Sequence, residues 1–299
     1  QTDMAIDQMR RLSAGDRPFA LFLSIGTPHD PWTPDNVPKR YLEMFRDAEL
    51  RLPPNYSPRN DRHADLWARL KPKDRKQLID WMRVYYAMIA DLDDNIGRLA
   101  EAVEALGLDR DTILVFTSDH GEMFGAHGRR AKNIFYDEAV RVPFLLRYGD
   151  ALPAGKNGAC LNTVDIMPTL LSMMNLPVPD SVEGTDRSEE IQNRPDTESG
   201  ALLMGTGPTA IFGNGREWRA WRTERYTYAV YRADGSEYLF DNLDDPYQMK
   251  NLVKDRPALL EQLRTAMHEK MDEIGDRFEK NSYYKKNWVE KRCIRETLN

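Results

Sequence analysis

The strongest constraint on the fold is a stretch, from about residue 73 to 106, in which apolar residues recur in alternating steps of four and three. This spacing places them on one side of a single continuous helix. Gly107 would end the helix, because glycine readily adopts the left-handed conformation found there. A stripe of this length also fits a coiled coil. It consists of Leu78, Met82, Tyr85, Ile89, Leu92, Ile96, Leu99, Val103 and Leu106.

An apolar run at residues 112–117 follows this helix within a few residues. The close succession favours the crossover helix of a strand-helix-strand unit over a coiled coil. Two further apolar runs, residues 19–25 and 142–147, are also expected to be strands that helices cover on both faces. We therefore predict an α/β fold with a doubly wound, mostly parallel sheet.

The remaining segments have simpler patterns. Amphipathic spacing predicts helices at residues 2–13 and 165–176. Residues 27–72, rich in proline and charge, are expected to be ordered but mostly irregular. Residues 118–141 are expected to form a loop and a short helix, and the polar residues 180–199 a loop.

Short β-prone runs become frequent after about residue 200. Asp234 and Gly235 stand between two of them and are typical of a hairpin turn. An amphipathic helix is expected at residues 256–277. We predict an incomplete α/β core at residues 1–199 and a small carboxy-terminal subdomain, an antiparallel sheet with a helix, at residues 200–299.

Composition excludes some classes of function. The net charge of −6 over 299 residues argues against a general nucleic-acid binder, which needs clustered excess Lys and Arg. No apolar stretch approaches the roughly 20 residues of a transmembrane helix, so we expect no membrane span. The two cysteines, Cys160 and Cys293, lie far apart, and we favour two thiols over a disulfide.

Polar motifs follow two of the predicted strands. His29 comes shortly after the first, and Asp119 and His120 come directly after residues 112–117. The carboxyl ends of parallel strands meet at one edge of a sheet, so we expect these three side chains near the same edge. Aspartate and histidine are common ligands of divalent metals, and Gly121 would allow both to face one ion. Two ligands are too few, and a stable site needs further carboxylates or a substrate oxygen.

The loop that follows is dense in glycine and in cationic side chains, which include His127, Arg129, Arg130 and Lys132. Glycines let the backbone approach a ligand, and cations donate hydrogen bonds to an oxyanion. The composition favours a sulfate or phosphate ester beside a metal. Taken alone, each motif is more typical of a rigid loop, a capped turn or a solvated cation.

Other aromatic and cationic residues fit either a sugar-binding pocket or ordinary packing, and packing is the commoner role of aromatics in a small sheet. They are Trp32, Arg216, Trp218, Arg219 and Trp221. We expect His63 and His268, which have no partner motif, to be structural or surface residues.

Residues 117–143 carry a specific resemblance. They read Thr-Ser-Asp-His-Gly-Glu-x-x-Gly-x-His-Gly-x-x-x-Lys and then Tyr-Asp-Glu-x-x-Arg-Val-Pro, which is similar to the second metal-binding motif of sulfatases in the alkaline-phosphatase superfamily. Upstream, residues 18–24 and the Pro-His-x-Pro of residues 28–31 resemble the sulfatase segment that leads to a substrate-contacting histidine. Downstream, residues 221–228 and 239–252 resemble the family's small carboxy-terminal subdomain. The match runs in order along nearly the whole chain.

The resemblance implies a role for each matching residue. Asp119 and His120 would be two ligands of one divalent metal, usually Ca²⁺ in sulfatases, with Mn²⁺ or Mg²⁺ as alternatives. Lys132 would contact the sulfate and a formylglycine side chain, and His29 would bind the sulfate or protonate the leaving oxygen. His127 would line the substrate pocket. The reaction would be attack of a formylglycine hydrate on the sulfur of a sulfate ester.

One part of the family pattern does not occur in the sequence. Sulfatases also have an amino-terminal strand with paired aspartates, and a Cys or Ser in a Cys/Ser-x-Pro/Ala-x-Arg context that becomes formylglycine. Neither Cys160 nor Cys293 has that context, and Ser13 has Gly15 at the third place. We expect this chain to be the carboxy-terminal two-thirds of a sulfatase, inactive without the missing amino-terminal segment.

Three functions stay open. A sulfuric ester hydrolase acting on a sulfated carbohydrate or an aryl sulfate is favoured. The alternatives are a phosphonate monoester hydrolase or phosphodiesterase of the same superfamily, and a non-catalytic pseudoenzyme that binds anions or glycans. We favour a periplasmic or extracellular location over a cytoplasmic one, and a homo-oligomer is compatible with the sequence.

Overall fold

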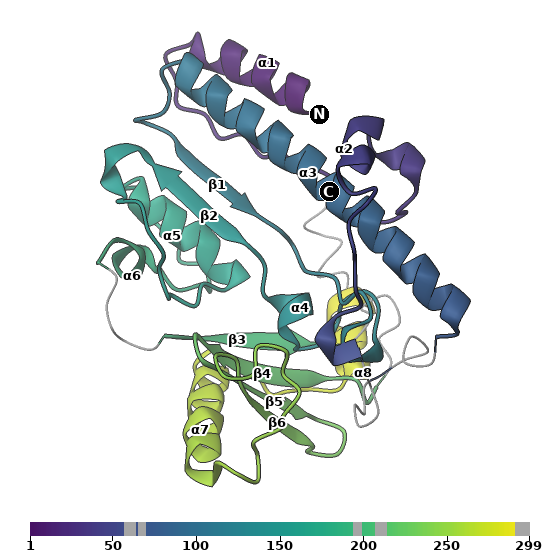
Figure 1. Ribbon diagram of the computed structural model, residues 1–299. Coiled ribbons are helices and arrows are strands. Elements are labelled where there is room, and N and C mark those ends of the chain that lie inside the picture. The colour runs from purple at the N-terminus through teal and green to yellow at the C-terminus, as the bar shows by residue number, and fades with distance from the viewer. Residues whose placement is uncertain (57–63, 65–69, 194–198, 207–213, 291–299) are drawn as a thin grey trace. The chain divides into compact units, whose positions relative to one another are not determined.

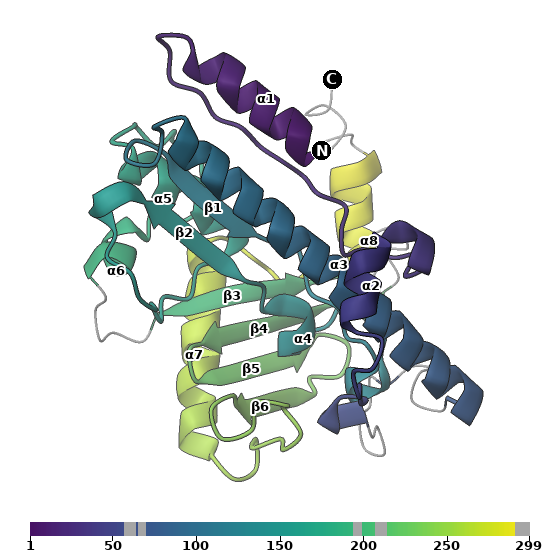
Figure 2. The ribbon, with the colours of Figure 1, turned by 45° about the horizontal axis from the view of Figure 1, so that its top comes forward.

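The computed structural model describes residues 1–56, 64, 70–193, 199–206 and 214–290 (Figure 1, Figure 2). His63 and Cys293 lie outside these residues. The chain forms two compact units, of which the first is Gln1–Ala131 with Val142–Pro153 and the second is Lys132–Arg141 with Ala154–Asn299. The boundary expected at residues 199 and 200 falls inside the second unit and stays a prediction.

Helix α3 (Pro72–Ala105) organises the first unit and confirms the long helix predicted from periodicity. It starts with a proline, whose missing amide would have no helical partner at that position. At its end the amide of Gly107 donates to the carbonyl of Glu104, and the amide of Leu108 donates to that of Val103. Gly107 has φ 67°, so glycine ends the helix in a Schellman motif.

Two short helices pack against α3. The predicted helix α1 (Thr2–Ser13) places Ile6 and Met9 against Val103 in the carboxyl-terminal half of α3. Helix α2 (Lys39–Met44) packs on α3 within a larger core. The buried members of this larger core are Trp32, Val37, Tyr41, Leu78, Met82, Val84, Ala87, Met88 and Phe124. It therefore fixes two distant loops, one with Trp32 and one with Phe124, to α3.

Strands β1 (Ile113–Thr117) and β2 (Phe144–Tyr148) pair in the first unit, and both were predicted. They pair antiparallel, with Thr117 opposite Phe144. The parallel arrangement expected for these strands was wrong, because residues 118–143 leave and return at the same end of the ladder instead of crossing a face. The α/β class itself is confirmed, since helices and strands alternate along the chain.

The strand predicted at residues 19–25 was also wrong. Residues 18–26 carry no strand, and Phe22 is 92% exposed. A run that is apolar on both faces is stable as a strand only when other strands pair with its backbone and helices cover it. In the part of the chain that the structure describes, β1 pairs only with β2 and offers no such partner.

The second unit contains the predicted small antiparallel sheet and helix (Figure 2). Its strands are β3 (Gly200–Gly205), β4 (Trp218–Thr223), β5 (Tyr226–Tyr231) and β6 (Glu237–Asp241), paired in that order. Gly235, at φ 65°, lies in the predicted turn between β5 and β6. Helix α7 (Pro257–Glu273) packs on the sheet through a core. That core consists of Leu202, Tyr228, Leu239, Leu260, Leu263, Met267 and Met271.

The other α-helices described in this unit are short. They are α4 (Asp137–Val140), α5 (Ile166–Met173), α6 (Ser188–Asn193) and α8 (Asn281–Tyr284). Helix α5 was predicted, whereas α6 interrupts a stretch expected to be a loop. The Asp186 carboxylate accepts a hydrogen bond at 2.8 Å from the amide of Ser188, the first residue of α6, and so pairs one of the amides that the start of a helix leaves without a helical partner.

The structure also bears on several smaller expectations. Trp218 and Arg219 are buried, in agreement with packing, and His268 is exposed. Cys160 is a free thiol. None of the helices in the described ranges is both long and apolar enough to span a bilayer.

Candidate active site

Trp32 fixes the first half of the candidate site, the loop that carries His29. Its indole Nε1 donates to the carbonyl of Pro28 at 2.9 Å, which closes the loop. Its ring centroid lies 4.5 Å from that of Phe124 and 6.2 Å from that of Tyr85 on α3. The loop is therefore held by a buried aromatic ring rather than by a preceding strand.

Glu122 organises the second half, residues 118–131. Its Oε1 accepts hydrogen bonds from the amides of Phe124 at 3.3 Å and Ala131 at 2.7 Å. Gly125 has φ 91°, and a Cβ at this position would lie 3.0 Å from the side chains of Leu78 and Tyr56. Glycine here lets the loop turn closely against α3.

Asp119 and His120 lie side by side at the start of this loop. The Ser118 hydroxyl donates to the His120 carbonyl at 2.9 Å, and the His120 amide donates to Asp119 Oδ1 at 2.9 Å. His120 Nδ1 lies 2.8 Å from the Gly121 carbonyl, which only accepts hydrogen bonds, so Nδ1 carries a hydrogen and, in the neutral ring, Nε2 has the lone pair. Nε2 is 3.5 Å from Asp119 Oδ2. The side chains of Asp119 and His120 thus lie close together.

The two loops meet, as the sequence predicted. The imidazole rings of His29 and His120 lie 6.5 Å apart between centroids in an edge-on arrangement. Arg130 Nη2 lies 2.8 Å from Asp30 Oδ2, a second link between the loops. We had expected the loops to meet because each leaves the carboxyl end of a strand. This reason was wrong for the loop of His29, because no strand leads into it. The core on α3 brings the two loops together instead.

Asp119 and His120 have the donor chemistry of a divalent-metal site. The Asp119 carboxylate is 84% exposed, and the lone pair on His120 Nε2 suits the same ion. Within the described ranges, no cluster of three His, Cys, Asp or Glu side chains forms. The pair therefore fits part of a metal site, which needs further oxygen ligands.

His127 and Lys132 occupy different surroundings. His127 is 5% exposed and has φ 51°, so it lies inside the turn of its own loop. Lys132 belongs to the second unit, where it begins the segment Lys132–Arg141. The roles of both residues in binding substrate stay predictions.

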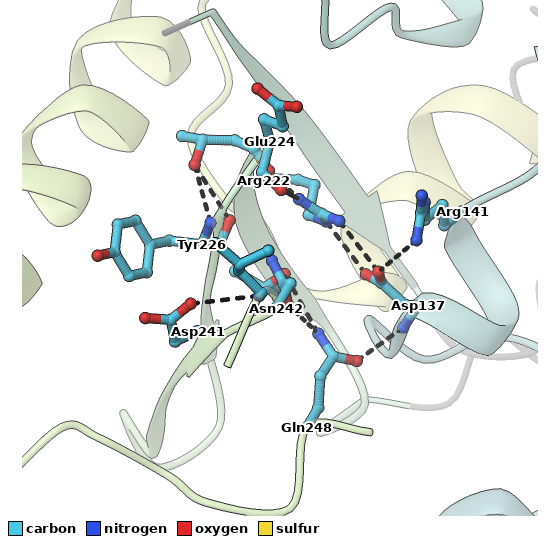
Figure 3. Close-up of polar contacts among 11 residues, drawn as sticks. Asp137, Arg141, Arg222, Glu224, Tyr226, Asp241, Asn242 and Gln248 are labelled. Atoms are coloured by element: carbon cyan, nitrogen blue, oxygen red, sulfur yellow. Dashed lines mark hydrogen bonds and ion pairs between the residues drawn. The ribbon is translucent and has the colours of Figure 1, made fainter. Parts of the chain in front are cut away.

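Asp137 holds this segment to the small sheet (Figure 3). Its carboxylate accepts from Arg222 Nε at 3.1 Å and Nη2 at 3.0 Å, and its amide donates to Gln248 Oε1 at 2.8 Å. Gln248 Nε2 in turn donates to Thr227 Oγ1 at 3.2 Å and Asn242 Oδ1 at 3.0 Å. Lys132 therefore lies at the start of a segment that strands β4 and β5 hold in place.

A family model described as Sulfatase matches residues 2–176, more than half of the chain. The chain belongs to the sulfatase family. A second model, N-sulphoglucosamine sulphohydrolase, C-terminal, matches residues 125–277. Together these matches agree with the resemblance found in the sequence.

Individual sulfatases and a solved structure are also similar to the chain. The ulvan-active sulfatase of Formosa agariphila is 37% identical over 287 residues, which cover 94% of this chain and 53% of that protein. The arylsulfatase of Clostridium perfringens is 31% identical over 258 residues, which cover 83% and 52%. The structure of yidJ from Bacteroides fragilis has a TM-score of 0.78 at 29% identity and covers 93% of this chain and 58% of that chain. This sulfatase chain spans about half the length of the curated relatives it matches.

Sequence reasoning overlooked two residues of this candidate site. Asp30 received no role, and Arg130 was treated mainly as a solvated cation, yet the structure pairs them. A signal for Asp30 was present, because a carboxylate next to a candidate catalytic histidine often orients its ring. Its partner Arg130 lies 100 residues away in sequence, so no local pattern joins the two.

Proposed function

We propose that the whole protein hydrolyses sulfuric esters of a carbohydrate or an aryl alcohol. The observation that carries the proposal is the 6.5 Å separation of the His29 and His120 rings, with Asp119 beside His120. This arrangement supports a role for His29 as a proton donor beside a metal held by Asp119 and His120. Family membership supports the reaction class, and the name of the ulvan-active relative supports a sulfated carbohydrate as substrate.

The residues of this chain would act on a tetrahedral sulfate group. His29 would donate a proton to the ester oxygen as the bond between sulfur and oxygen breaks. Lys132 would balance the negative charge of the sulfate oxygens, and His127 would line the pocket. Proton donation matters most for a sugar alcohol, because an alkoxide is a poor leaving group.

Two further groups complete the proposal. Asp119 and His120 would hold one divalent metal, most simply Ca²⁺, with Mn²⁺ or Mg²⁺ as alternatives, together with ligands from outside this chain. Such an ion, when bound, withdraws electron density from the sulfate oxygens. The attacking group would be a formylglycine from an amino-terminal segment that completes these 299 residues, so the chain alone should be inactive.

The substrate class also bears on location. A sulfated polysaccharide is a large polyanion, and charged groups are costly to move into an apolar bilayer. We therefore propose that the whole protein works in the periplasm or outside the cell. Assembly into a homo-oligomer stays a prediction.

Turnover by the whole protein, purified with its formylglycine formed, tests the proposal. We expect hydrolysis of 4-nitrophenyl sulfate and of a sulfated oligosaccharide, and no turnover by the 299-residue chain. His29→Ala and Lys132→Ala should each lower kcat/KM by about a hundredfold or more, whereas the exposed His268→Ala should not. Faster turnover of phosphonate monoesters would favour the phosphonate hydrolase alternative. Binding of the sulfated glycan without turnover would favour the pseudoenzyme.

A further inference from the structure

We propose that Asp30 is a positioning residue, whose carboxylate holds Nδ1 of His29 so that Nε2 faces the leaving oxygen of the substrate. The inference rests on the proposed function, because it assumes that His29 acts on a sulfate ester. It gives Asp30 a role in the proposed reaction and explains how the imidazole ring of His29 is oriented.

The contacts around Asp30 define the orientation. His29 Nδ1 lies 2.9 Å from Asp30 Oδ1 and 3.0 Å from the Asp30 carbonyl oxygen. A carboxylate and a carbonyl oxygen only accept hydrogen bonds, so Nδ1 must carry a hydrogen. The other carboxylate oxygen, Oδ2, accepts from Arg130 Nη2 at 2.8 Å. The Asp30 carboxylate thus lies against His29 Nδ1 with one oxygen and accepts a hydrogen bond from Arg130 with the other.

Arg130 connects this arrangement to the buried core. Its guanidinium carbon lies 5.2 Å from the ring centroids of both Trp32 and Trp81. Such cation–π contacts favour one position of the guanidinium. Because both tryptophans pack in the core on α3, the line of contacts from that core through Arg130 and Asp30 restrains the His29 ring.

Stability alone does not explain these contacts. The side chains of His29, Asp30 and Arg130 are 59%, 38% and 32% exposed. An ion pair at such exposure contributes little to the stability of the fold. An imidazole ring that is more than half exposed needs partners to hold its orientation, and here they are the backbone carbonyl of Asp30, which accepts a hydrogen bond from Nδ1, and the Asp30 carboxylate beside it.

The orientation matters at the step that cleaves the ester. Among the residues that the structure describes, Nδ1 is the only nitrogen of His29 with a hydrogen-bond partner, so Nε2 is left for the substrate. As an oxygen of the proposed formylglycine hydrate forms its bond to sulfur, the bond from sulfur to the leaving oxygen breaks. Its electron pair stays on the leaving oxygen, which takes the proton from Nε2. The imidazolium becomes a neutral imidazole, and Nδ1 keeps its proton on Asp30.

The test compares two aryl sulfates in the whole protein. The 4-nitrophenolate ion leaves easily without a proton, whereas the phenolate from phenyl sulfate depends more on proton donation. We expect Asp30→Asn and Asp30→Ala to lower kcat for phenyl sulfate by about tenfold more than kcat for 4-nitrophenyl sulfate, with KM nearly unchanged. In a His29→Ala background, Asp30→Ala should cause no further loss.

Matched controls separate positioning from folding. Asp35→Asn removes an exposed carboxylate from the same loop and should leave both rates unchanged. Asp30→Asn keeps the size of the side chain, and its thermal midpoint should match the wild type. Equal losses on both esters, unchanged rates, or an added loss in the double variant would overturn the positioning role while leaving the sulfatase assignment intact. A whole protein that turns over no sulfate ester would overturn both.

Discussion

The rings of Trp32 and Phe124 lie 4.5 Å apart between centroids, and this contact joins the loop of His29 to the loop of Asp119 and His120. Trp32 is 6% exposed. We expect Trp32→Ala to lower the free energy of unfolding by about 3–5 kcal/mol, because it leaves a cavity in the core on α3. Denaturant unfolding of the 299-residue chain measures this, and the whole protein should lose turnover in parallel.

Phe22→Ala is the matched control for this substitution. Phe22 is 92% exposed, so its removal should change the stability of the 299-residue chain by no more than about 0.5 kcal/mol. Similar losses of unfolding free energy for Trp32→Ala and Phe22→Ala would contradict the conclusion that Trp32 stabilises the core on α3.

The buried pair of Arg219 and Asp276 predicts how the second unit responds to pH. Their side chains are 2% and 8% exposed, and Arg219 Nη2 donates to Asp276 Oδ1 at 2.9 Å. Burial by itself would raise the pKa of the Asp276 carboxyl, but the hydrogen bonds and charge of Arg219 outweigh it and lower that pKa. The pair therefore stabilises the fold fully above the ordinary aspartate pKa of about 3.9 and loses this effect as pH falls through the lowered value.

Asp276→Asn should lower the free energy of unfolding at pH 7 by about 3–5 kcal/mol, because Arg219 stays buried without its counter-charge. The difference from the wild type should shrink as the pH falls below about 4. Urea unfolding across pH 2–7 measures both effects. Asp255→Asn, which breaks an exposed pair with Lys250, should cost no more than about 1 kcal/mol. A constant difference at all pH values would show that the Asp276 carboxylate does not titrate as expected.

Local patterns predicted much of this fold. The stripe on α3 and its end at Gly107 depend on neighbouring residues, and the hairpin at Gly235 depends on one turn. The pairing of β1 with β2 depends on residues far apart in sequence, and the antiparallel register could not be read from either strand. The run at residues 19–25 failed for the same reason, since a strand exists only with its partners.

The motifs predicted which residues form the candidate site, but they did not predict the packing that brings these residues together. Asp119 and His120 are neighbours in sequence, and His29 follows an apolar run, so their approach was expected from strand polarity. The structure achieves it through Trp32 and Phe124, which side-chain packing alone brings together. Packing partners at such a separation leave no periodic signal in a single sequence.

The amide of Asp137 offers a test of how the small sheet holds the segment that carries Lys132. It donates to Gln248 Oε1 at 2.8 Å, and Gln248 is 2% exposed. Gln248→Ala should increase hydrogen exchange at this amide by about fivefold or more, because a hydrogen bond of about 1 kcal/mol is lost. Exchange at the Gly107 amide, which closes α3, should not change. Unchanged exchange at Asp137 would mean that Arg222 alone holds the segment.

Metal binding by Asp119 and His120 can be measured without turnover. A ligand that binds only the folded state raises the unfolding midpoint with its concentration, so Ca²⁺ added to the EDTA-treated whole protein should do so. Asp119→Asn and His120→Ala should each weaken the apparent affinity by about tenfold or more, because each removes a direct ligand. Asp111→Asn, an exposed aspartate before the other end of β1, should leave the response unchanged. The 299-residue chain alone should respond little, because two ligands do not make a stable site; an equal response from it would place the remaining ligands within these residues.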